Sequence, residues 1–181
     1  MRVLMVAMCV VATIGACASS VSTDRPLLVG GNESDEPHSS ACLPTQDDAT
    51  STVDNGPVFN ASEHRLTVTD VTLVDSLDMR IIDTVLVPSN GAVNGVSYPP
   101  DPVHAGPGWG ERIPAEGAVL EAGAEWWLVV GVAADGPMPS ARRFWVDYVD
   151  ESGQRYRART GKSVIIRPKC VGADDKWPDG W

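Results

Sequence analysis

The stretch 141–167 constrains the fold more than any other part of this 181-residue chain. Residues 144–149 read Phe-Trp-Val-Asp-Tyr-Val, so large apolar side chains recur with the two-residue period of a β-strand. Residues 150–154 form a short polar segment in which Gly153 can adopt a positive φ, as tight hairpin loops require. Residues 155–159 return as Arg-Tyr-Arg-Ala-Arg. The sequence therefore predicts a β-hairpin whose second strand carries one basic face.

Three earlier segments also have the character of strands. Residues 65–75 hold two pairs of alternating apolar positions whose phase slips near Thr69 and Asp70. Such a slip predicts a β-bulge, or a strand that passes from one sheet to the other. Residues 79–88 are mostly apolar and β-branched and end at a proline, and residues 125–133 form a nearly continuous apolar run.

With a last strand at 162–167, the chain offers six to seven short strands and no convincing amphipathic helix. This pattern predicts an all-β fold, an antiparallel immunoglobulin-like β-sandwich over residues 57–170. The immunoglobulin arrangement of two central cysteines around a tryptophan is absent. A Leu-Val-Val-Gly strand at 128–131, followed by a Tyr-x4-Gly-x2-Tyr hairpin at 148–156, resembles secreted β-sandwich proteins of high-GC Gram-positive bacteria. No activity follows from that resemblance.

The N-terminus has the layout of a secretory signal peptide. A basic start at Met1-Arg2 precedes an apolar run over residues 3–14, and small residues follow. The apolar run is too short to span a bilayer as a stable helix. We therefore expect an extracytoplasmic protein.

Residues 14–17, Ile-Gly-Ala-Cys, resemble the lipobox of bacterial lipoproteins, which more often begins with Leu. The resemblance implies that residues 1–16 are removed and that Cys17 receives a diacylglyceryl group, so that a lipid anchors the chain to the cell membrane. The alternative is ordinary secretion, with cleavage in the same small-residue segment. Residues 17–56 are rich in polar residues, glycine and proline, and this composition predicts a flexible spacer.

The chain has four cysteines. Cys9 would leave with the signal and Cys17 would be lipidated, which leaves Cys42 and Cys170 as a pair in an oxidising compartment. We expect them to form a disulfide that ties the ends of the domain together. Two free thiols are the alternative.

Composition limits the partners. Lysine and arginine number 14 against 24 aspartate and glutamate, which gives a net charge of −10 and makes nucleic acid an unsuitable partner. No nucleophile, metalloprotease or phosphate-loop motif occurs, so we expect a non-enzymatic protein without cofactors. The expected partners are the membrane, through the lipid anchor, and a protein or a cell-wall polymer.

Two regions are candidate binding sites. The first is the Gly- and Pro-rich segment 89–114, which is longer than most connections and carries Tyr98, His104 and Trp109. The second is the basic strand face of the hairpin, which could instead pair with acidic residues on neighbouring strands. Its candidate residues are Arg155, Arg157 and Arg159.

The sequence thus favours a lipid-anchored extracytoplasmic binding or surface module. One alternative is copper handling by His104 and Met138, since imidazole and thioether groups suit that metal. Another is a cell-wall glycan-binding accessory domain that uses exposed tryptophans such as Trp109. The C-terminal tail, residues 171–181, either covers one end of the sandwich or contributes its tryptophans to binding.

Overall fold

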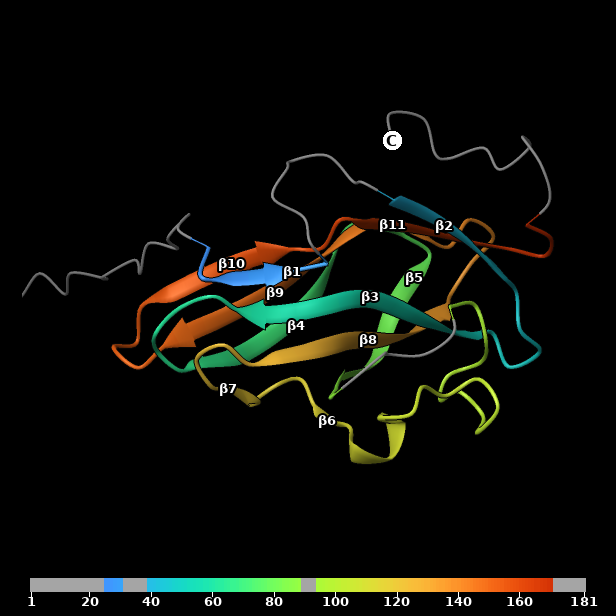
Figure 1. Cartoon of the computed structure of the whole chain (residues 1–181). Helices are drawn as coiled ribbons and strands as arrows, with labels where there is room; N and C mark the ends of the chain where they lie inside the picture. Colours follow the sequence, from blue (N-terminus) through green and yellow to red (C-terminus); the bar gives the residue numbers. More distant parts are fainter. Residues whose placement is uncertain (1–24, 31–38, 89–93, 171–181) are drawn as a thin grey trace, which may run out of the picture.

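A computed structural model describes residues 25–30, 39–88 and 94–170. These residues form a two-layer β-sandwich, drawn in Figure 1. The elements are β1 (Leu27–Val29), β2 (Ser39–Pro44), β3 (Thr50–Asn60), β4 (Leu66–Leu77), β5 (Met79–Val87), the 3-10 helix η1 (Trp109–Glu111), β6 (Ile113–Pro114), β7 (Val119–Leu120), β8 (Glu125–Ala134), β9 (Ser140–Asp150), β10 (Arg155–Arg159) and β11 (Lys162–Arg167). No helix in these residues is long and apolar enough to cross a membrane.

One sheet has five strands in the order β1-β3-β8-β5-β6. The other has six, in the order β2-β11-β9-β4-β7, with β10 also paired to β9. Every pairing is antiparallel except β2 with β11, which is parallel. The predicted immunoglobulin-like β-sandwich is confirmed. The described strands outnumber the predicted six to seven. β1, β6 and β7 have only two or three residues, too few to show a period, and β2 and most of the 11-residue β3 lie in the segment expected to be a spacer.

The core lies between the two sheets and follows from the alternation of side chains along the strands. From β9, Phe144, Val146 and Tyr148 point inward and are buried. The β8 strand contributes Leu128, Val130 and Val132, and the other strands complete one continuous cluster. Full burial of each such side chain stabilises the fold by about 1.5–3 kcal/mol.

The predicted phase slip in β4 is a β-bulge. The register between β4 and β9 shifts between Val68 and Asp70, so Thr69 is the extra residue. The predicted hairpin loop also forms as expected, with Gly153 at φ 82°.

The chain passes from one sheet to the other at Asp78, which joins β4 directly to β5 and has φ 51°. The Asp78 carboxylate accepts a hydrogen bond from the Met138 backbone N–H at 3.0 Å, and its carbonyl accepts one from the Asp135 N–H at 2.8 Å. This corner therefore fixes the loop between β8 and β9.

The expected flexible spacer over residues 17–56 is wrong for its described part, and the fold begins well before residue 57. Leu27 and Val29 of β1 are 1% exposed, and β2 pairs with β11 over six consecutive positions. β1 has only three residues, β2 is mostly polar, and the long strand β3 begins at Thr50 inside the expected spacer and pairs with the distant β8. Composition alone therefore does not reveal these strands. Cys17 and the tail 171–181 lie outside the described residues.

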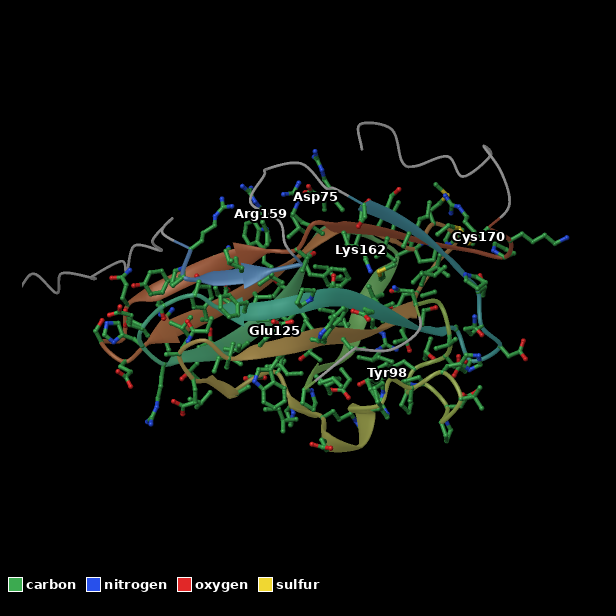
Figure 2. All side chains as sticks on the ribbon, viewed as in Figure 1. Asp75, Tyr98, Glu125, Arg159, Lys162 and Cys170 are labelled. Carbon is green, nitrogen blue, oxygen red and sulfur yellow. A yellow bond between two sulfur atoms is a disulfide. The ribbon has the colours of Figure 1, made fainter. Side chains whose placement is uncertain are left out.

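The predicted disulfide is confirmed. Cys42 in β2 and Cys170 beyond β11 are bonded, with a Cα–Cα distance of 5.6 Å (Figure 2). It locks the parallel β2–β11 pair at the end where both strands stop.

Candidate functional site

Residues 94–112 cover the outer face of the five-stranded sheet. At their start they bond along β3: the Thr52 N–H donates to the Val96 carbonyl at 2.7 Å, and the Gly95 N–H donates to the Thr52 carbonyl at 2.9 Å. Tyr98 then packs onto Val85, Val87 and Val129 and is only 9% exposed. This second apolar cluster fastens the segment to the sheet.

Two details hold the Tyr98 ring in place. Its hydroxyl donates to Asp83 Oδ2 at 2.7 Å, and burial raises the pKa of this phenol well above its usual range. Its ring lies directly over Gly131 of β8, where an added Cβ would come within 2.5 Å of the ring. The glycine therefore provides the space that the ring occupies.

The other candidate residues of this segment are engaged within it. Trp109 is half-buried, meets Tyr98 edge-on at 6.0 Å between ring centroids, and lies under the Arg112 guanidinium at 4.7 Å. His104 Nδ1 lies 2.9 Å from Asp101 Oδ1. Hydrogen bonds, the first from the His104 backbone N–H, lower the pKa of the Asp101 carboxyl. Tyr98, predicted as a binding residue, is instead an anchor of the fold, because apolar side chains of β5 and β8 enclose it.

The arginine face lies on the other side of the sandwich, on the outer surface of the six-stranded sheet. Figure 2 shows Arg159 and Tyr98 on opposite sides. Pairing between β10 and β9 sets Arg155 opposite Val149, Arg157 opposite Asp147, and Arg159 opposite Trp145. The two regions singled out in the sequence are therefore separate and cannot form one site.

Arg157 is the most constrained of the three. Its Nε and Nη2 atoms donate to the two carboxylate oxygens of Asp147 at 2.5 and 2.7 Å, and its guanidinium lies 4.0 Å from the Trp145 ring centroid. The hydrogen bond to Asp147 raises the pKa of Arg157. This fork-to-fork geometry fixes both side chains and neutralises their charges.

Arg155 and Arg159 differ from Arg157 and from each other. Desolvation is the main cause that lowers the pKa of Arg159, which is partly buried. Arg155 is exposed, and its side chain forms no hydrogen bond or ion pair with the described part of the chain. Arg155 is therefore the arginine with a guanidinium available to a ligand.

The bulge in β4 helps to form a cavity of about 300 Å³ on this face. We call it the bulge pocket, and its lining residues come from three neighbouring strands. They are Thr69, Asp70, Asp147, Tyr148, Arg155, Tyr156 and Arg157. The structure thus brings Arg155 and Arg157 into one site and leaves Arg159 outside it.

Hydrogen bonds around Asp150 fix the loop that joins β9 to β10. Asp150 Oδ1 accepts hydrogen bonds from the backbone N–H groups of Ser152 and Gln154, each at 2.9 Å, and Oδ2 accepts from the Tyr156 hydroxyl at 2.9 Å. Hydrogen bonds, the first from the Ser152 side chain, lower the pKa of Asp150. The Tyr156 ring stacks on Tyr148 at 5.3 Å between centroids.

Sequence reasoning missed the acidic side of the pocket. Asp147 could have been found, because it alternates on the outer face of the predicted hairpin opposite the arginines. Asp70 could not, since its side chain reaches this face only after the bulge has shifted the register.

The two residues of the copper alternative have separate partners. The Met138 sulfur accepts a hydrogen bond from Arg167 Nη1 at 3.3 Å, whereas His104 is bonded to Asp101. Within the described ranges, no group of three or more His, Cys, Asp or Glu side chains is arranged to hold a metal ion.

No protein-family model matches the chain, and no curated protein matches it. Among solved structures, the chain is similar to an ASH/PapD-like domain of human CEP192, with a TM-score of 0.41 and 10% identity over 93% of this chain and 99% of that one. It is also similar to the Vibrio cholerae VesB protease, with a TM-score of 0.38 and 13% identity over 78% of this chain and 32% of that one.

Proposed function

We propose that this protein is a lipid-anchored extracytoplasmic binding module that holds its partner at the bulge pocket. The observation that carries the proposal is the pocket itself. It combines fixed polar groups with an available guanidinium, on the outer face that residues 94–112 do not cover. Its volume lies at the lower end of the range for ligand clefts.

The side chains around the pocket favour binding over catalysis. Both oxygens of Asp147 accept hydrogen bonds from Arg157, so the Asp147 carboxylate is already engaged by a neighbouring side chain and is poorly placed to act on a ligand. The Tyr156 ring packs against the core, and its hydroxyl donates to Asp150. We therefore infer a rigid recognition surface and no reaction of its own.

The anchor is the second part of the proposal, and it rests on residues 14–17. Intact mass of the protein purified from the membrane fraction tests it. We expect a chain that starts at Cys17 and carries diacylglyceryl, with Cys42 and Cys170 oxidised. An unlipidated chain would replace the anchored module by a diffusible one.

Binding is tested by sedimentation of the purified protein with isolated cell walls, the polymer partner that we propose. We expect wild type to co-sediment and the double variant Arg155→Gln, Asp70→Asn to remain in the supernatant. Arg112→Gln is the control for the loss of an exposed guanidinium, which it removes from the opposite face. Equal sedimentation of wild type and the double variant would overturn the proposal.

A further inference from the structure

The charges of the bulge pocket lie at two ends with a neutral centre between them. The central Asp147–Arg157 pair is internally neutralised. Asp70 on β4 and Arg155 on β10 flank this pair, on opposite sides of β9. The pocket therefore presents one negative and one positive end.

Both end groups are available. Asp70 is exposed, and among the described residues its Oδ1 accepts a hydrogen bond from the Val71 backbone N–H at 2.8 Å. Its charge also acts on Arg157, whose pKa it helps to raise, but no hydrogen bond joins the two side chains. Arg155 is exposed and has no hydrogen-bond or ion-pair partner among the described residues. A carboxylate accepts well from an ammonium group, and a guanidinium donates two parallel hydrogen bonds to a carboxylate.

The spacing of the two ends limits the size of the ligand. β4 and β10 are two strand spacings apart, about 10 Å. The long Arg155 side chain can reach toward Asp70, so the distance that a ligand must bridge between the two charged groups is shorter than this. A cavity of about 300 Å³ admits a single small molecule or the end of a chain.

From this placement we propose that the bulge pocket binds a zwitterion of amino-acid to dipeptide size, with its ammonium on Asp70 and its carboxylate on Arg155. This inference rests on the proposed function, of which it specifies the ligand. A purely anionic ligand would meet Asp70 and the net charge of −10 of the whole chain. A neutral saccharide would leave both end charges without a counter-ion.

Titration calorimetry of the full mature chain in detergent tests the proposal with three probes. The probes are alanyl-alanine, its N-acetyl derivative, which lacks the ammonium, and its C-terminal amide, which lacks the carboxylate. We expect each blocked form to bind at least about tenfold more weakly than the free dipeptide, because each loses one charge-assisted interaction.

Variants assign each end of the ligand. Arg155→Gln should weaken the free dipeptide by about tenfold or more and leave the affinity for the amide unchanged. Asp70→Asn should weaken the free dipeptide and leave the affinity for the N-acetyl form unchanged. Arg112→Gln, on the opposite face, should change neither affinity.

Equal binding of the free and blocked dipeptides, or no binding of any of the three probes, would overturn the zwitterion inference. If the cell-wall test still depends on Arg155 and Asp70, those results leave the proposed function standing. If binding to cell walls does not depend on Arg155 and Asp70 either, both the proposed function and the zwitterion inference are wrong.

Discussion

The two outer faces of this sandwich differ in what covers them. Residues 94–112 cover the five-stranded sheet and bury Tyr98 against Val85, Val87 and Val129. The six-stranded sheet carries paired charges, the bulge of β4 and a pocket. The comparison teaches that aromatic residues in a Gly- and Pro-rich segment can form a second apolar cluster, whereas alternating charges on a strand can line a pocket.

The largest expected effect is on the covered face. Tyr98→Ala removes the side chain that anchors residues 94–112, and we expect the free energy of unfolding to fall by about 3–5 kcal/mol, as for other buried aromatic truncations. Urea denaturation measures it. Tyr98→Phe, which loses only the hydrogen bond to Asp83, should cost about 1 kcal/mol. Similar small losses for both variants would show that the ring is not an anchor.

A substitution in β8, under the Tyr98 ring, should also destabilise the covered face. Gly131→Ala places a Cβ within 2.5 Å of the Tyr98 ring, so the ring must move. We expect a loss of about 1–3 kcal/mol in thermal or urea unfolding, typical of overpacking. In Gly131→Ala with Tyr98→Ala the two costs should not add, because the smaller side chain leaves room for the new methyl group. Simple additivity would contradict the contact.

On the uncovered face the expected costs are smaller. Arg157→Ala loses the fork with Asp147 and the stacking on Trp145, which we expect to cost about 1 kcal/mol in urea denaturation. Arg155→Ala should stay within about 0.5 kcal/mol, as at an exposed position without partners. If Arg155→Ala proved the more destabilising of the two, Arg155 would be a structural residue and a poor ligand group.

Acid should affect the hairpin loop before the buried parts of either face. The pKa of Asp150 is lowered in the folded chain, so its hydrogen bonds contribute stability above the unfolded value of about 3.9 and are lost as the pH falls through the lower folded value. NMR titration should show the amide signals of Ser152 and Gln154 following the Asp150 carboxyl below about pH 4. The Val129 methyl signals serve as the reference. Titration of Asp150 at or above its ordinary value would contradict this.

Much of the fold could be predicted because apolar alternation and turn residues act locally. The hairpin, the β4 bulge and the β5 and β8 strands follow from neighbours in the sequence, and cysteine number and position were enough to pair Cys42 with Cys170. β1, β2 and β3 were not predicted. β1 pairs with β3, β2 with β11 and β3 with β8, and the last two pairings join residues far apart in the chain.

The candidate site was likewise predictable only where it depends on residues that are neighbours in the sequence. The arginine alternation marked one wall of the bulge pocket from the sequence. The acidic end, Asp70, is set by a register shift between β4 and β9, and the burial of Tyr98 is set by a space at Gly131 that lies 33 positions further on. Contacts of this kind are decided by tertiary packing and leave no local signal.

The disulfide would have a mechanical consequence if the proposed lipid anchor holds the chain by one end. Cys42 and Cys170 are 128 positions apart, so the chain between them cannot be lengthened by tension applied to its two ends. β3 to β11 lie inside this closed loop, and β1 lies before it. Pulling would transfer load through the sulfur–sulfur bond from β2 to the end of β11. Of the described strands, only β1 and the part of β2 before Cys42 lie outside the closed loop and could be peeled away by tension applied to the two ends of the chain.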